Sequence, residues 1–248
     1  MKIRLVFSKL VEKHTFLLGA VLCSALSYYL FPTFFLMQIT PMLADPGVLL
    51  DPSASYMVLG PALSTLQYEP LHNHNFLWSS LRGLGWPLLG GDLQGAPLFP
   101  LTLAWIWLPL SQFWSAMICS RMILTALAAF LIAREMFRFR TWSALFFVMN
   151  LAFAVYSLRL INHAWSNSVC AGLWYLYFLD RLLCDQKLGR YGFLGLVISV
   201  YSMVTSGFPE GALALGVMAW LMHVARLLSL KRARTLDARG YLKGLLLA

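Results

Sequence analysis

Long apolar stretches recur along this chain, and short groups of basic residues separate them. The first stretch, residues 15–38, is long enough to cross about 30 Å of hydrocarbon as a helix. Of the 248 residues, 60% are hydrophobic and only 12% are charged, whereas soluble domains are about 45–50% apolar and about 25% charged. The sequence therefore predicts an integral membrane protein. It excludes a soluble domain, a disordered chain and a disulfide-stapled secreted module.

The apolar stretches predict an all-α fold, a polytopic bundle of about six transmembrane helices with a large non-cytoplasmic first loop. The expected parts are a cytoplasmic N-terminus (1–14), a first transmembrane helix (15–38), a large extracytoplasmic loop (39–97), the remaining transmembrane helices (98–230), and a cytoplasmic segment that starts a truncated further helix (231–248). Later spans are expected at 112–133, 142–156, 164–183, 191–205 and 212–228, after a short interfacial piece at 98–108. The first stretch exceeds the apolar core of a signal peptide, which favours an uncleaved anchor.

Residues 40–97 differ in kind from the rest of the chain. They hold seven of the eleven prolines, four of the ten acidic residues and a single basic residue, Arg82. Such a broken backbone would leave its amides unsatisfied in lipid, so this segment is expected outside the membrane. Long loops are usually functional or disordered, and the tryptophans and leucines here argue against disorder.

The basic residues predict an orientation. With residue 1 in the cytoplasm, the cytoplasmic segments hold most of the 19 Lys and Arg residues: four at the N-terminus, three at 134–140, three at 181–190 and six from 226 onward. This is the positive-inside bias of membrane proteins, so the net charge of +9 does not indicate a nucleic-acid partner. The long loop, the polar residues 159–167 and the turn at 206–211 then share the non-cytoplasmic face.

Asp51 is the first candidate for chemistry because it follows the first span closely and precedes Pro52. A carboxylate beside low-dielectric surroundings could act as a general base on an acceptor hydroxyl. With Asp92 or Glu210 it could also bind a divalent cation, the one cofactor that the sequence suggests. The alternative is a helix cap, since Asp-Pro commonly occupies the first positions of a helix. Spacing alone favours the cap.

Glu210 is the second candidate, in the sequence SGFPEG at 206–211. The turn would place a carboxylate at the outer edge of the membrane, where ionisable residues are often functional. The alternative is a solvated residue in the first turn of a helix, where the helix dipole favours an acid. The sequence does not separate these two roles.

Arg159 and His163 form a third candidate site, with Asn162 and Asn167 nearby. Arg159 breaks the positive-inside pattern, and its guanidinium would suit a phosphate at the outer surface. An interfacial arginine that extends to lipid headgroups is the alternative, which the sequence alone slightly favours. Arg121 lies within an expected span and also needs a partner, which the sequence does not name.

Residues 76–100 read FLWSSLRGLGWPLLGGDLQGAPLFP and combine a tryptophan, a Gly-x-Pro-Leu turn and an aromatic-Pro entry into the next helix. With Asp51 upstream and the turn at 206–211, this pattern resembles bacterial YfhO-type membrane proteins of the GT-C glycosyltransferase superfamily, over residues 10–230. Two departures are Phe208, where the family has His, and Ser79, where Asn usually follows the tryptophan.

The resemblance implies a GT-C-like helix bundle in the bacterial plasma membrane and a polyprenyl-phosphate-linked sugar as donor. In this picture Asp51 is the catalytic base and Glu210 positions substrate or a metal. Trp78 and Asp92 are expected to contribute to the substrate site. Arg159 and His163 are candidates for the lipid phosphate, on the charge argument alone.

Three functions remain open from the sequence. The first is a membrane glycosyltransferase, or the N-terminal part of one, acting on the extracytoplasmic face. The second is a lipid or sugar transporter or flippase, although no inverted repeat of the kind found in transporters is visible. The third is a non-catalytic membrane protein with the same fold.

Overall fold

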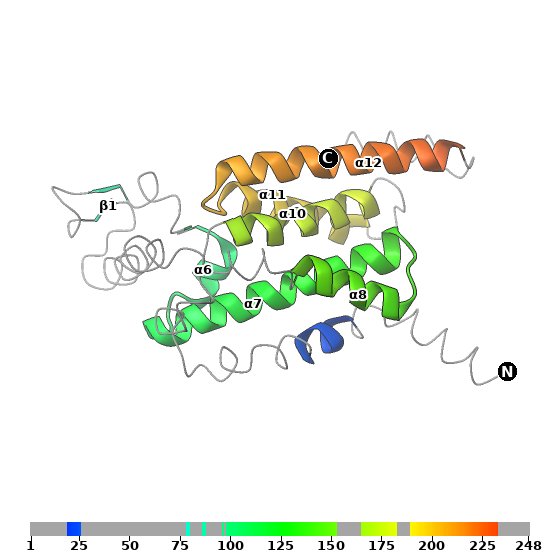
Figure 1. Ribbon diagram of the computed structural model, residues 1–248. Helices are drawn as coiled ribbons and strands as arrows, with labels where there is room; N and C mark the ends of the chain where they lie inside the picture. Colours follow the sequence, from blue (N-terminus) through cyan, green and yellow to red (C-terminus); the bar gives the residue numbers. More distant parts are fainter. Residues whose placement is uncertain are drawn as a thin grey trace.

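The computed structural model describes residues 19–25, 78–79, 86–87, 96, 98–152, 165–182 and 189–232. Nearly all of these residues are helical, and the chain is all-α, as the sequence predicts. The long helices lie side by side along one axis (Figure 1). The short helix α6 (Pro100–Trp105) and the strand β1 (Trp78–Ser79) lie at one end of them.

Among the described residues, five further helices and one π-helical turn follow α6. They are α7 (Leu110–Leu131), the π turn η4 (Ile132–Met136), α8 (Thr141–Ala152), α10 (Trp165–Asp180), α11 (Gly189–Val204) and α12 (Pro209–Arg232). Proline opens two of these helices, Pro100 in α6 and Pro209 in α12. Its fixed φ suits the first helical position, where its missing N–H is not needed.

Helix α7 is largely buried, with α8 and α10 packed against it. Its inward residues include Ile118, Ala126, Ala129 and Phe130, all fully buried. The alanines let neighbouring backbones approach closely, as small residues do between membrane helices. Residues 19–25 also pack on α7, since a Cβ on Gly19 would lie 2.6 Å from the ring of Phe130.

Helices α11 and α12 are peripheral. Both pack on α10, and an apolar groove of about 680 Å³ separates them. Large apolar side chains on these helices are exposed, among them Val204 at 74% and Leu213 at 71%. So much contiguous apolar surface is unusual for a protein in water and is expected on a helix that faces lipid.

Two helices of the described part are long and apolar enough to cross a membrane, Ser115–Met136 and Pro209–Leu228. The first is 83% buried inside the protein and would also suit a soluble core, whereas the second is only 22% buried. Thr141–Leu151 and Tyr191–Val204 are shorter apolar helices. The expected count of about six spans therefore stays a prediction, and most of the first expected span lies outside the described residues.

A small ladder interrupts the expected loop at 39–97, and the sequence did not predict it. Strand β1 pairs antiparallel with β2 (Trp86–Pro87), so that Trp78 lies opposite Pro87 and Ser79 opposite Trp86. The ladder joins two pieces of the pattern that resembles the YfhO-type proteins.

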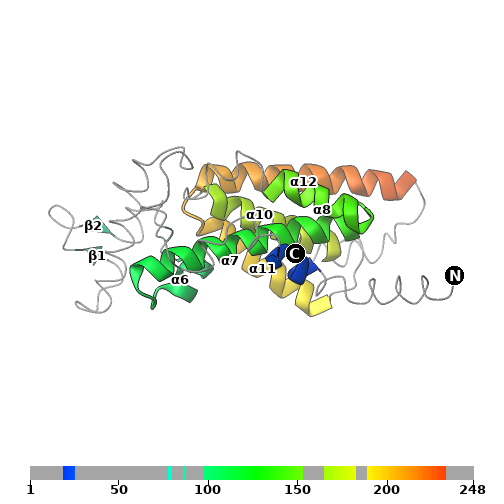
Figure 2. The same ribbon diagram turned by 60° about the horizontal axis from the view of Figure 1, so that its bottom comes forward.

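The alternation of helix directions gives the bundle two distinct ends, which Figure 2 shows from a second side. We call the first the charged end, where α7 with η4, α10 and α12 finish: Glu135, Met136, Tyr177, Asp180, Arg181 and Arg226. We call the second the turn end, where α10 and α12 begin: Arg121, Trp165, Asn167, Ser168, Ser206 and Phe208. Tyr201 Oη donates to the carbonyl oxygen of Leu98 at 3.0 Å, so the chain entering α6 also lies at the turn end.

Candidate functional site

Four of the six residues predicted from the sequence lie outside the described residues. They are Asp51, Asp92, Arg159 and His163. Trp78 is described as part of β1. Their proposed roles therefore stay predictions.

Glu210 is described, and it lies in the first turn of α12 directly after Pro209. Its side chain is exposed, and it makes no ion pair with any residue of the described ranges. This placement matches the solvated first-turn role, in which the helix dipole favours a negative charge. It leaves Glu210 at the turn end, where an approaching group could reach it.

The structure gives Arg121 a partner that the sequence could not name. Arg121 Nη1 donates a hydrogen bond of 2.8 Å to Asn167 Oδ1 at the start of α10. Asn167 Nδ2 in turn donates to the carbonyl oxygen of Ser206 at 3.1 Å. This chain of contacts joins α7, α10 and the turn before α12. Asn167 belongs to the polar patch singled out in the sequence, whereas Ser206 was noted only as part of its turn.

The turn itself is held by further contacts. Ser168 Oγ and Ser206 Oγ share a hydrogen bond of 2.7 Å, and Ser168 Oγ also donates to the carbonyl oxygen of Phe208 at 3.3 Å. Phe208 packs edge-on against Trp165, with ring centroids 5.5 Å apart. Gly207 has a φ of 83°, a left-handed conformation that glycine adopts without strain. The SGFPEG sequence thus forms a fixed cap on the buried arginine.

The charge of Arg121 is unusual for its surroundings. The residue is only 2% exposed, and its Nη2 has no hydrogen-bond partner among the described residues. Asn167, its one hydrogen-bond partner, is neutral. Burying a charge without an opposite charge is costly, and such groups in proteins are normally paired.

The depth of Arg121 in the bundle follows from helix geometry. About 15 residues separate it from Met136 at the charged end, which at about 1.5 Å per residue corresponds to about 22 Å. The hydrocarbon core of a membrane is about 30 Å thick. A membrane with one boundary at the charged end would therefore place Arg121 about midway between its centre and its opposite boundary.

A cavity of about 300 Å³ lies one helical turn from the Arg121–Asn167 pair. Leu124 of α7 and Cys170 of α10 line it, each three residues from a member of the pair. The start of α6 also lines it, as does the side of α11 that carries Ser199 and Ser202. The cavity is almost entirely apolar.

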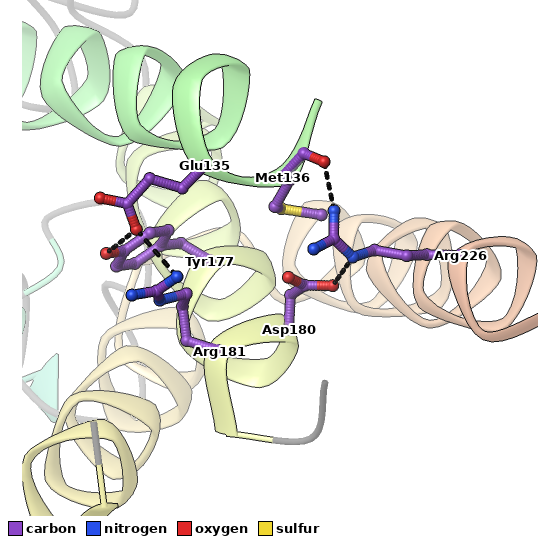
Figure 3. A network of polar contacts seen from close by, with 6 residues as sticks. All are labelled: Glu135, Met136, Tyr177, Asp180, Arg181 and Arg226. Carbon is purple, nitrogen blue, oxygen red and sulfur yellow. Dashed lines mark hydrogen bonds and ion pairs between the residues drawn. The ribbon is translucent and has the colours of Figure 1, made fainter. Parts of the chain in front are cut away.

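The charged end holds its charges differently, as Figure 3 shows. Arg181 Nη1 lies 3.2 Å from Glu135 Oε2, and Tyr177 Oη donates to the same oxygen at 3.0 Å. Arg226 Nε lies 2.7 Å from Asp180 Oδ1, and Arg226 Nη1 donates to the carbonyl oxygen of Met136. Sequence reasoning did not single out Glu135 or Asp180, although both stand beside arginines at the ends of apolar stretches.

No group of three or more potential metal-binding side chains occurs in the part of the chain that the structure describes. A divalent cation at Asp51, with Asp92 or Glu210, is therefore neither supported nor tested. Comparison with known protein families, curated proteins and solved structures finds no match to this chain.

Proposed function

We propose that this chain is an integral protein of a bacterial plasma membrane, with the charged end at the cytoplasmic side. Two observations support the membrane location: the two helices of sufficient length and the exposed apolar surface of α12. The orientation is supported by the arginines at 134–140, 181 and 226, which gather toward one end of the helices, as the positive-inside bias requires.

We further infer that the turn end is the site of a glycosyltransferase that uses a polyprenyl-phosphate-linked sugar. The observation that carries this proposal is the convergence at one end of three segments that the sequence assigns to the outer face. They are the exit of the long loop at Leu98, the start of α10 and the SGFPEG turn, joined by the Tyr201–Leu98 and Asn167–Ser206 hydrogen bonds. The resemblance to YfhO-type proteins supplies the reaction class.

In the proposed reaction, the carboxylate of Asp51 accepts the proton of an acceptor hydroxyl. The hydroxyl oxygen forms a bond to the anomeric carbon of the donor sugar, and the bond from that carbon to the lipid phosphate oxygen breaks. The lipid phosphate leaves with the electron pair as an anion. A base placed to accept the proton contributes about 10²–10⁴-fold to such a step.

The test is sugar transfer in membranes that contain the protein, supplied with radiolabelled polyprenyl-phosphate sugars. Asp51→Asn should lower transfer to endogenous acceptors by about 10²-fold or more. Asp45→Asn is the matched control, since it removes a neighbouring carboxylate of the same predicted loop. It should transfer sugar as the wild type does.

Two outcomes contradict this proposal. Equal transfer by Asp51→Asn and wild type would remove Asp51 as the base and direct attention to Glu210 or Asp92. Absence of transfer by wild type with every donor supplied would contradict the glycosyltransferase function. Movement of the lipid-linked sugar across the membrane without covalent change would then identify a flippase, and neither activity would leave a non-catalytic protein.

A further inference from the structure

We propose that Arg121 binds the phosphate group of a membrane-embedded phosphate ester, whose apolar chain occupies the adjacent cavity between α6, α7, α10 and α11. The inference deepens the proposed function and rests on it for the identity of the lipid. It gives the phosphate a binding residue other than Arg159 and His163.

The guanidinium of Arg121 has no opposite charge beside it in the described residues. The Arg121 side chain is buried and makes one hydrogen bond, to a neutral amide. Within the ranges that the structure describes, its Nη2 has no partner, although a guanidinium offers five donors in a fixed fork. That fork matches two oxygens of a phosphate or carboxylate.

The distribution of carboxylates also bears on this charge. The described residues include three acids, and two of them, Glu135 and Asp180, already pair with arginines at the charged end. The third, Glu210, is exposed in the first turn of α12 and does not pair with Arg121. The anion that would balance Arg121 is thus not a carboxylate of the described part of the protein.

An apolar cavity lies beside the charge. Leu124 and Cys170 line the cavity and lie on the helices that carry Arg121 and Asn167, respectively. By its helical rise, Arg121 lies about midway between the centre and the expected outer boundary of the hydrocarbon. The cavity begins one helical turn further along α7 and α10, at Leu124 and Cys170. An ester with a charged head and an apolar chain matches both features, whereas a free anion matches only the first.

The alternative is that Arg121 serves only to hold α7, α10 and the turn together. The two roles differ in what a ligand does to the protein. Anything that binds the folded state raises the melting temperature, so a binding residue changes the response to ligand. A purely structural residue changes the melting temperature without ligand and leaves the response intact.

The experiment uses the full chain in maltoside micelles, which contain no phosphate ester, and measures binding by the shift in melting temperature. Farnesyl phosphate is the probe, farnesol is the same chain without the anion, and inorganic phosphate is the anion without the chain. Arg121→Gln is compared with Arg134→Gln, which removes a charge from the same helical segment at the charged end. We expect Arg121→Gln to weaken farnesyl phosphate binding by about 10–100-fold, as the loss of a charge-assisted hydrogen bond predicts. Arg134→Gln should bind as the wild type does.

Several results would overturn the proposal. They are equal binding by Arg121→Gln and wild type, equal binding of farnesol and farnesyl phosphate, or no binding of farnesyl phosphate to wild type. Saturation by inorganic phosphate alone would overturn the assignment of the cavity to the apolar chain. If Arg121→Gln does not insert, Arg121→Lys is measured, and its lack of a planar fork should still weaken binding. Farnesyl phosphate binding that persists in a protein without sugar transfer would uphold this site and contradict the glycosyltransferase function.

Discussion

The two ends of the bundle treat buried charge in opposite ways. At the charged end, Arg226 faces the carboxylate of Asp180 and Arg181 faces Glu135. At the turn end, Arg121 hydrogen-bonds the neutral amide of Asn167 and pairs with no carboxylate of the described residues. Pairs that compensate each other within the protein hold helices together. A cation left without an internal anion indicates a group that an external partner completes.

The two ends should also differ in the free energy that is lost when an arginine is removed. Removing one member of a buried pair costs about 3–5 kcal/mol, because the remaining charge is left uncompensated. Removing a lone buried charge instead relieves a desolvation penalty. The same change from arginine to an apolar residue should therefore have different consequences at the two ends.

The largest expected effect is at the charged end. Arg226→Met removes the ion pair to the fully buried carboxylate of Asp180 and should lower the free energy of unfolding by about 3–5 kcal/mol. Chemical denaturation in mixed micelles measures it. The double variant Arg226→Met with Asp180→Asn should recover part of the loss, and a double variant no more stable than the single one would show that the pair is not coupled.

A smaller loss of stability is expected when a methyl group is added at Gly211, at the turn end. A Cβ on Gly211 would lie 2.5 Å from the rings of Phe208 and Trp165. Gly211→Ala should therefore destabilise the fold by about 1–3 kcal/mol, the usual cost of overpacking. Gly216→Ala on the same helix is the control, because its Cβ would meet its nearest neighbour, Met203, at an ordinary 3.5 Å. Equal stability of the two variants in the same denaturation assay would contradict the packing described for the turn.

The smallest effect concerns the partly exposed pair of the charged end. The side chains of Arg181 and Glu135 are 13% and 21% exposed, so solvent screens their attraction. Glu135→Gln should cost about 1 kcal/mol, and added salt should reduce the difference from wild type. The exposed Arg140 serves as control, since Arg140→Gln should change stability by less than about 0.5 kcal/mol. A loss of stability for Glu135→Gln as large as that for Arg226→Met would show that burial of the ion pair does not determine the size of the loss.

Periodic apolar stretches predicted the helices well because span length and flanking charges are local properties. The expected span at 112–133 is α7 at Leu110–Leu131, and the expected span at 191–205 is α11 at Gly189–Val204. The end of the first differs because the π turn η4 carries the helix on to Met136, which places Glu135 and Met136 at the charged end.

The site was less predictable because its contacts join residues far apart in the chain. Arg121 could be recognised from the sequence as a charge that needs a partner, but Asn167 is 46 residues away. The pairing of Trp78 with Pro87 likewise depends on the path of the loop, since a proline by itself argues against a ladder. Glu210 was predicted at a shared end of the bundle, and its exposure there follows from its position after Pro209.

The central claim is that Arg121 is a charge held for a ligand and not for the fold. The direct test compares the unfolding free energies of Arg121→Met and Arg226→Met in maltoside micelles, which contain no phosphate ester. The account predicts that Arg121→Met stays within about 1 kcal/mol of wild type, because the relieved desolvation offsets the orphaned amide oxygen of Asn167. Arg226→Met should lose about 3–5 kcal/mol. A loss at Arg121 as large as that at Arg226 would contradict the claim and make Arg121 a structural residue.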